Sequence, residues 1–269
     1  MPGYICITCG TQYPESEAAP AACPICEDER QYVRAEGQAW TTLERLREEH
    51  TNRMEPEAPA LLGIGTEPSF AIGQRALLVQ RPAGNVLWDC IALLDGATKE
   101  RIDALGGISA IAISHPHYYT TMVEWARAFD APVHLHEADR RWVQRPDPHL
   151  RFWSGERHEV AEGVTLVRLG GHFPGGQVLH WREGAEGRGA LLTGDIIQVV
   201  PDAGWVSFMY SYPNLVPLPA AEVLRISATT QTLEFDAIHG AWWGRSIRTD
   251  AKAAVRRSAE RYVAALQAG

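Results

Sequence analysis

Four short apolar runs in the chain each lead directly into a residue that can bind a metal ion. The runs are "AIAIS", "VTLVRLGG", "ALLTG" and "FDAI", and the residues that follow them are His115 and His117, His172, Asp195 and His239. In layered α/β proteins, sites assemble from loops at one end of the strands. The repeated pattern therefore constrains the chain to a fold that brings strand ends together, and it predicts a metal centre there.

The rest of this region alternates between strand-length and helical segments, which predicts an α/β layered domain. "RALLVQ" and "GNVLWDC" are predicted to be neighbouring strands, and "VHLH" a further strand. One helix is predicted over "TKERIDAL" and a second from Thr121, where "TMVE" fits a capping box with Glu124. The chain has 269 residues, 45% of them hydrophobic, which is enough for a sizeable core in one or two domains.

A second candidate metal site lies at the start of the chain. Cys6 and Cys9 form one CxxC pair, Cys23 and Cys26 form another, and 13 residues separate the pairs. Four thiolates suit a tetrahedral zinc site. Two disulfides and an iron site like that of rubredoxin are the alternatives, and the short spacer favours a zinc ribbon. Cys90 stands apart and is predicted to be a small buried apolar residue.

The cysteine pairs set the predicted domain boundaries. Residues 1–35 are predicted to form the zinc-ribbon-like module, 36–60 a helical linker and 61–269 the main domain. The linker is expected to hold a short helix within 36–50, capped by Thr41 or Thr42, and to include the proline-rich and charged stretch "EPEAP". A module of this size cannot fold on its own core, so metal binding would supply its folding energy. Its role would be structural, or it would contact a protein partner.

Charge and hydropathy exclude several classes of protein. The formal net charge of −8 argues against a nucleic-acid partner held through phosphates. The sequence has no run of 18 apolar residues, so it predicts no membrane-spanning helix. The stretch "MPGYICITCG" lacks the pattern of a secretory signal. We therefore expect a cytoplasmic protein with a small-molecule substrate, and the sequence leaves its oligomeric state open.

At this point a family resemblance becomes visible. "SHPHYYT", "GGHFPGG", "LLTGDII" and "AIHGAWWGR" resemble, in order and spacing, the metal motifs of the metallo-β-lactamase superfamily over residues 61–269. The resemblance implies a four-layer αβ/βα sandwich, with two mixed sheets face to face and helices outside. It also implies that His115, His117 and His172 hold a first metal ion, that Asp195 bridges two ions, and that His239 is the last ligand.

The first motif departs from the HxHxDH pattern of the superfamily. Tyr119 stands at the aspartate position and Thr120 at the second-site histidine position. A neutral phenol with a pKa of about 10 is a poor zinc ligand at neutral pH. The second metal site therefore keeps only Asp195 and His239, unless His136 or water completes it. His134 and His136 alternate along one predicted strand, and a structural role is favoured for them.

The resulting hypothesis is a hydrolase with one zinc ion in the main site. Hydroxide bound to the metal would attack an ester, thioester, lactone or amide, and Asp195 or Tyr119 would partly replace the missing aspartate. Substrate contacts are predicted from Tyr210 and Tyr212 in "WVSFMYSYPN" and from Arg245.

Two alternatives from other classes stay open. One is an iron oxygenase in which His115, His172 and Asp195 form a facial triad, so that iron replaces zinc. The other is a non-catalytic binder with a degraded second site. Metal identity distinguishes the hydrolase from the oxygenase.

Overall fold

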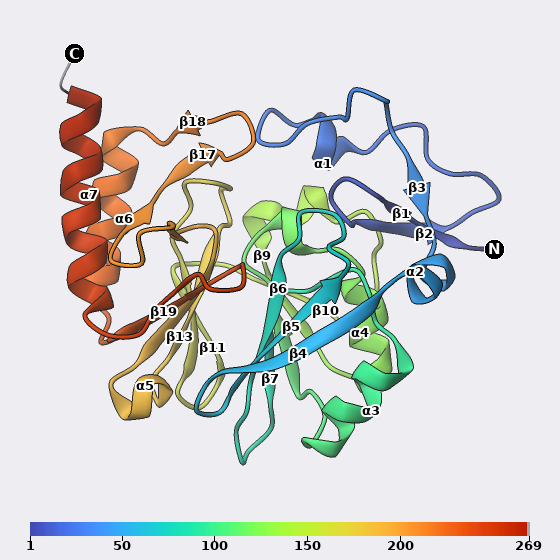
Figure 1. Cartoon of the computed structure of the whole chain (residues 1–269), viewed down its shortest axis with the longest axis horizontal. Helices are drawn as coiled ribbons and strands as arrows, with labels where there is room; N and C mark the ends of the chain where they lie inside the picture. Colours follow the sequence, from blue (N-terminus) through green and yellow to red (C-terminus); the bar gives the residue numbers. More distant parts are fainter. Residues whose placement is uncertain (268–269) are drawn as a thin grey trace. The chain divides into compact units, whose positions relative to one another are not determined.

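The computed structural model describes residues 1–267, and the chain divides into two compact units, Met1–Trp153 and Ser154–Gly269. Both are drawn in Figure 1. The first unit contains the cysteine pairs and the loop with His115 and His117. The second contains His172, Asp195 and His239. None of the helices within residues 1–267 has both the length and the apolar composition needed to cross a bilayer.

The N-terminal part of the first unit is a small sheet that carries the cysteines. Its strands are antiparallel in the order β2-β1-β3, with bounds β1 Gly3–Cys6, β2 Gln12–Glu15 and β3 Trp40–Thr41. The helices here are α1 Pro24–Glu27 and α2 Leu43–Glu49. The predicted helix within 36–50 is confirmed in part, because it starts after Thr42, whose side chain accepts from the Arg45 amide at 3.4 Å.

The main sheet of the first unit has seven strands in the order β10-β9-β8-β7-β6-β5-β4. Their bounds are β4 Thr51–Ala58, β5 Leu61–Glu67, β6 Arg75–Val79, β7 Val86–Trp88, β8 Ala110–Ala112, β9 Val133–His136 and β10 Leu150–Trp153. Strands β4 to β7 pair antiparallel, whereas β7 to β10 pair parallel. The helical elements are α3 Gly96–Ala104, α4 Met122–Phe129, and the 3₁₀ turns η1 Pro116–Tyr118 and η2 Glu137–Trp142 (Figure 1). The predicted strands and both predicted helices are confirmed.

The prediction that residues 55–59 are a linker is wrong. These residues lie largely in β4, which pairs with β5 from Thr51 to Ala58. Pro56 is tolerated because β4 is the edge strand of the sheet, where a missing N–H costs no ladder hydrogen bond. Glu57 forms an ion pair with the fully buried Arg75 of β6. The main sheet therefore begins at Thr51 rather than near residue 61, while the predicted boundary at residue 35 stays a prediction.

The predicted capping box at the start of α4 is also wrong. Thr121 is the N-cap residue, but its hydroxyl donates to the carbonyls of Ile91 (3.2 Å) and Ala92 (2.9 Å) and does not cap the helix. The Glu124 carboxylate accepts from Gln12 Nε2 at 3.0 Å, so it does not bond the N-cap amide. Long-range partners outcompeted the local motif at both positions.

Within residues 154–267, six strands form the sheet of the second unit, in the order β11-β12-β13-β14-β19-β20. Their bounds are β11 Arg157–Ala161, β12 Val164–Arg168, β13 Gln177–Trp181, β14 Ala190–Gly194, β19 Ala237–Gly240 and β20 Ser246–Ile247. Short pairs connect the larger elements: β15 Gln198–Val199 with β16 Val206–Ser207, and β17 Met209–Ser211 with β18 Val216–Pro217. Helix α5 is the single turn Gly184–Gly187.

Two longer helices complete the second unit, α6 Ala220–Gln231 and α7 Ala251–Gln267, which pack side by side (Figure 1). Both contribute to its core. Val223 and Ile226 of α6, and Val255 of α7, are fully buried with Leu191 of β14 and Ile238 of β19. This core fixes the strands whose ends carry the predicted ligands.

Candidate metal sites

The four cysteines of the N-terminal sheet form one buried cluster. Cys6 ends β1 and Cys9 follows it in the same tight turn, while Cys23 and Cys26 lie at the start and inside of α1. Their sulfur atoms all lie within 4.8 Å of one another. The Cys6–Cys26 and Cys9–Cys23 Sγ distances are both 3.6 Å, and all four cysteines are free.

These distances distinguish a metal site from two disulfides. A disulfide needs a sulfur–sulfur distance of about 2.05 Å. Zn–S bonds of about 2.3 Å in a tetrahedron place the sulfurs roughly 3.8 Å apart. The donor set therefore fits a tetrahedral metal ion with four thiolate ligands, and hydrogen bonds from Cys23 and Cys26 lower the pKa of the Cys6 thiol. Cys90 is fully buried outside this cluster, as predicted.

His115 and His117 follow β8 at the carboxyl end of the parallel part of the first sheet. His115 is the N-cap of η1, which Pro116 starts, and this turn brings the two rings to a centroid distance of 5.0 Å. Both are buried, at 1% and 3% exposure. Two neighbouring imidazoles shielded from water are a donor pair suited to zinc, copper, iron or nickel.

A buried aspartate supports this turn, and sequence reasoning missed it. Asp89 follows β7, the neighbour of β8, and its carboxylate accepts from the Ser114 amide at 2.7 Å. The Ser114 hydroxyl lies 2.9 Å from His115 Nδ1. Hydrogen bonds of this kind orient a metal-binding imidazole and fix which nitrogen can bind. The sequence signal was present in "LWDC", an acid directly after a strand.

The residues that depart from the superfamily pattern are buried in the same loop. Tyr119 is 2% exposed, and burial together with the nearby Asp139 carboxylate raises the pKa of its phenol well above the ordinary value. Thr120 is 3% exposed and has φ +36°, a left-handed conformation that β-branched residues rarely adopt. Neither side chain is suited to bind a metal ion at neutral pH. His136, at the end of β9, is buried with its ring 4.5 Å from that of Trp153.

In the second unit, the three predicted ligands come from strands that run in one direction. β12 and β13 are antiparallel, β13 and β14 are antiparallel, and β14 and β19 are parallel, so β12, β14 and β19 end at the same edge. His172 lies in the loop after β12, and Asp195 follows β14 directly. His239 lies inside β19 rather than after it, beside Gly240, which pairs with Gly194.

Hydrogen bonds orient both histidines of this edge. His172 Nδ1 lies 2.7 Å from the carbonyl of Tyr210 and 3.2 Å from that of Met209. A carbonyl only accepts, so Nδ1 carries the proton and Nε2 carries the lone pair that a metal ion requires. His239 Nδ1 lies 3.1 Å from the Ser246 hydroxyl on β20.

The three residues predicted to contact a substrate are half-buried. Tyr212 donates its hydroxyl to the main-chain carbonyl of Asp195 at 2.7 Å, and its ring lies 5.7 Å from that of His172. Burial and Asp195 raise the pKa of Tyr212. Tyr210 packs against the core of the second unit, and Arg245 is half-buried with its carbonyl bound by the Gly240 amide. Their contact with a substrate stays a prediction.

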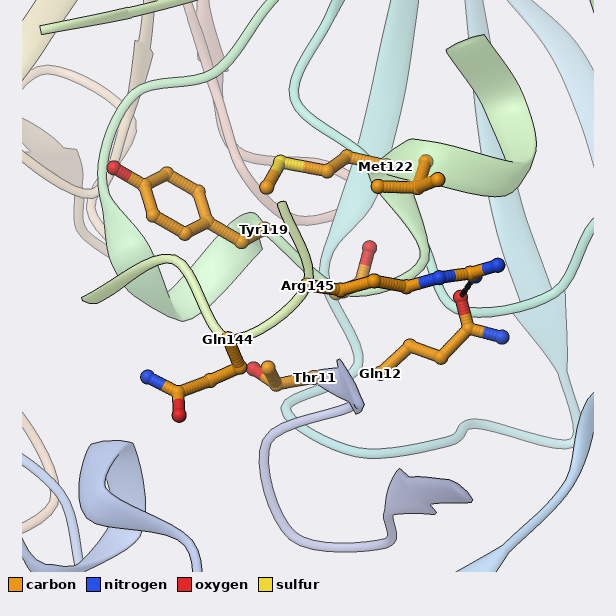
Figure 2. A pocket seen from close by; sticks show the side chains of 8 residues that line it. Thr11, Gln12, Tyr119, Met122, Gln144 and Arg145 are labelled. Atoms are coloured by element: carbon orange, nitrogen blue, oxygen red, sulfur yellow. Dashed lines mark hydrogen bonds between the residues drawn. The ribbon is translucent and has the colours of Figure 1, made fainter. Parts of the chain in front are cut away.

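A small pocket adjoins the histidine loop in the first unit (Figure 2). It encloses about 10 Å³, roughly the volume that holds one water molecule. The residues that line it are Thr11, Gln12, Tyr119, Thr120, Met122, Val123, Gln144 and Arg145. It is too small for a substrate and marks a packed contact between the ribbon and the loop.

Solved structures show which class of protein has this fold. A crystal structure of the DIM-1 metallo-β-lactamase exposed to ceftazidime superposes with a TM-score of 0.61 at 12% identity, over 80% of this chain and 97% of that one. VMB-1 gives 0.60 at 12% identity, over 80% and 98%. A metallo-β-lactamase of Cronobacter sakazakii with an HARLDQ motif gives 0.52 at 18% identity, over 80% and 92%. The chain therefore has the α/β fold of the metallo-β-lactamases, the four-layer αβ/βα sandwich, preceded by a four-Cys module of zinc-ribbon type.

Sequence comparison gives the particular family. No family model matches the chain. YmaE, an uncharacterized protein of Bacillus subtilis (strain 168), is 54% identical over 268 residues, which covers 99% of this chain and 97% of YmaE. The chain belongs to the same family as YmaE. Together with the metallo-β-lactamase fold, the chain has buried histidines that could hold a metal ion.

Proposed function

We propose that the chain is a hydrolase that uses one zinc ion, with His115, His117 and His172 as its ligands and with Asp195 as a further acidic residue of the centre. The observation that carries the proposal is the buried pair His115 and His117 at the carboxyl end of β8, supported by Ser114 and Asp89. The metallo-β-lactamase fold supports the participation of His172 and Asp195.

The residues present fit a single ion better than two. His115, His117 and His172 are three imidazoles, the donor set of a catalytic zinc site with an open position. Bound zinc would supply a Lewis acid and an activated water. Tyr119 and Thr120 replace the donors that a second ion requires, and a phenol and an aliphatic hydroxyl are poor zinc ligands at neutral pH.

We propose roles for the remaining residues. Asp195 would accept a proton as general base, because it is the buried carboxylate of the site. Tyr212, through its hydrogen bond to the Asp195 carbonyl, would position that aspartate. Tyr210 and Arg245 would contact an ester, thioester, lactone or amide substrate.

Metal content tests the proposal. The purified chain is analysed by mass spectrometry beside a variant with Cys6, Cys9, Cys23 and Cys26 changed to serine. The wild-type chain is then screened against ester, thioester and lactone substrates. About one zinc per chain in the variant and turnover that a chelator abolishes would support the proposal. One iron with oxygen consumption would favour an oxygenase, and no metal beyond the cysteine-bound ion in the wild-type chain would favour a binding protein.

A further inference from the structure

The turn that carries two of the ribbon cysteines rests directly on the histidine loop. Gln12, three residues after Cys9, donates its main-chain N–H to the Thr120 carbonyl at 3.0 Å. Gly10 has φ +79°, and a Cβ there would come within 3.2 Å of the Thr120 methyl carbon. Thr120 is the third residue after His117. The close approach leaves no room between the cysteine turn and the loop.

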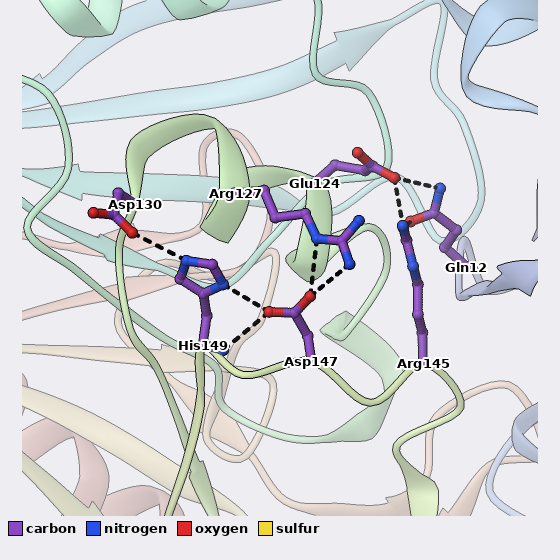
Figure 3. Close-up of polar contacts among 7 residues, drawn as sticks. All are labelled: Gln12, Glu124, Arg127, Asp130, Arg145, Asp147 and His149. Carbon is purple, nitrogen blue, oxygen red and sulfur yellow. Dashed lines mark hydrogen bonds and ion pairs between the residues drawn. The ribbon is translucent and has the colours of Figure 1, made fainter.

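The side chain of Gln12 extends this contact to α4. Its Nε2 donates to Glu124 Oε1 at 3.0 Å, and Arg145 donates to both the Gln12 Oε1 and the Glu124 carboxylate. Figure 3 shows the three side chains converging, and Figure 2 shows Arg145 meeting Gln12 beside the small pocket. Gln12 and Arg145 are 4% and 9% exposed. One residue of the ribbon therefore holds both the loop carbonyl and the first turn of the helix that follows.

The position of Gln12 depends in turn on the cysteine site. The Cys6 amide donates to the Thr11 carbonyl at 3.0 Å, the Gly10 amide donates to the Cys6 carbonyl at 2.8 Å, and Cys9 Sγ contacts the Thr11 hydroxyl at 3.3 Å. This turn is short and wraps the first two thiolates. A segment of this size keeps its fold by binding metal. Without the ion, Gln12 is no longer held against Thr120.

Thr120 explains why this contact matters to the histidines. A non-glycine residue at φ +36° is sterically disfavoured and persists only where its surroundings hold it there. Its carbonyl is held by Gln12, and its neighbour Thr121 is held by Ile91 and Ala92. Release of Gln12 removes one of these restraints from a loop whose preceding turn bears His115 and His117.

We propose that Gln12 is a positioning residue, through which the loaded four-Cys site strengthens metal binding at His115 and His117. This inference rests on the proposed metal centre at the histidines. The two sites are then coupled, and coupling between binding sites is reciprocal. The histidine ion strengthens metal binding by the cysteines by the same factor.

A cobalt(II) titration of the full chain tests the coupling, because thiolate ligands give a charge-transfer absorption that imidazole ligands lack. Gln12→Ala removes the side-chain contacts and keeps the N–H to Thr120, whereas Gln12→Pro removes the N–H as well. Gln144→Ala is the matched control, since this glutamine lines the same pocket but its amide donates only to the Trp142 carbonyl. Thermal melting and the visible spectrum of the histidine-bound cobalt are recorded for each variant.

We expect cobalt affinity at the histidines to fall about tenfold in Gln12→Ala, and further in Gln12→Pro and in Cys23→Ser/Cys26→Ser, within the usual range of coupling between sites. Gln144→Ala should bind like the wild type. The histidine-bound cobalt spectrum should change in Gln12→Ala at temperatures well below its melting transition, where the variant is fully folded, which a merely structural role would not produce. Unchanged histidine-site affinity in Gln12→Ala and in the double serine variant would overturn the proposal.

Two further results keep the outcomes distinct. If Gln12→Pro does not fold, the coupling is measured in the opposite direction. In the wild type, cobalt bound at the histidines should raise the cobalt affinity of the cysteines about tenfold. His115→Ala should abolish this gain in affinity. If the wild type binds cobalt only at the cysteines, and His115→Ala changes nothing, the proposed metal centre is wrong and the coupling with it. Independent binding at both sites would refute the coupling alone.

Discussion

The four-Cys turn and the histidine loop lie against each other in the first unit, yet they are built in opposite ways. The cysteine site takes all four donors from one short segment, whose two CxxC turns each shape a pair of thiolates. The histidine loop supplies His115 and His117 alone, and Tyr119 and Thr120 occupy the positions of further donors. A site that closes on local ligands is suited to a structural ion, whereas a site with missing ligands leaves coordination positions open.

The supporting interactions of the two regions differ as well. The ribbon has little core of its own: Ile5 packs with Leu43 and Leu46 of α2 and with Ala92 and Leu93. The histidine turn instead sits at the end of a buried parallel sheet and is held by Asp89 and Ser114. The comparison indicates that loss of its metal ion should unfold the four-Cys ribbon, whereas the backbone of the histidine turn should stay in place without an ion.

The largest effect is expected from removing ligands of the ribbon. Cys23→Ser/Cys26→Ser should lose about one zinc per chain and leave residues 1–35 unprotected in hydrogen exchange, because metal binding supplies the folding energy of such modules. Metal analysis and amide exchange measure both effects. Cys90→Ala, which removes a buried thiol outside the cluster, should keep the full zinc content. Equal protection with and without the cysteines would contradict the structural role.

The next effect concerns the histidine turn. His115→Ala should remove about one ion from the main site and reduce any hydrolysis to background, while the ribbon keeps its ion. The protein should remain folded, since the β7 and β8 pairing does not depend on this ring. Metal analysis with circular dichroism checks both points. His180→Ala, a half-buried histidine bound to the Glu234 carbonyl, serves as the control and should change neither.

Restoring the superfamily pattern tests whether the histidine loop lacks a second metal ion because Tyr119 and Thr120 supply no donors. Tyr119→Asp/Thr120→His should raise the metal content by about one ion per chain. It should also lower the melting temperature, because the imidazole at position 120 would press against Gly10 of the ribbon. Tyr119→Phe, which adds no donor, should leave the metal content unchanged. A double variant without an extra ion would mean that Asp195 and His239 do not form the remainder of a second site.

The smallest effect involves a network of charged side chains that includes Arg127 of α4. Asp147 accepts from His149 Nδ1 (2.6 Å) and from Arg127, and His149 Nε2 lies 3.2 Å from Asp130 (Figure 3). Asp147 first, and then Asp130, raises the pKa of His149 above 6.5. Protonated His149 therefore stabilises the fold fully below about pH 6.5, and this contribution is lost as the pH rises through the raised pKa of the folded state.

We expect the melting temperature of His149→Asn to lie about 1–2 °C below that of the wild type at pH 5.5, and the gap to narrow by pH 8.5. The effect is small because solvent screens the pair. Asp130→Asn should reproduce only part of the gap, since the Asp130 side chain is 98% exposed. A gap that widens with pH would show that the sign of the linkage is wrong.

Local chemistry allowed the sequence to determine much of this protein. CxxC spacing dictates where two thiolates lie, so the four-Cys cluster followed from Cys6, Cys9, Cys23 and Cys26 alone. Strand-length apolar runs gave β6 to β9, because burial on both faces leaves a continuous apolar pattern. The metal motifs allowed the fold to be predicted, because the order and spacing of their ligands resemble those of one superfamily.

Tertiary structure decided the rest, for reasons that no local pattern contains. Most of "EPEAP" lies in strand β4, because β5 supplies hydrogen-bond partners and Arg75 forms an ion pair with Glu57. Thr121 and Glu124 do not form a capping box, because their side chains form hydrogen bonds with Ile91, Ala92 and Gln12 instead. The contact of Gln12 with Thr120 joins residues more than a hundred positions apart. Such partners exist only once the chain has folded, whereas the spacing of cysteines and histidines is written in the sequence itself.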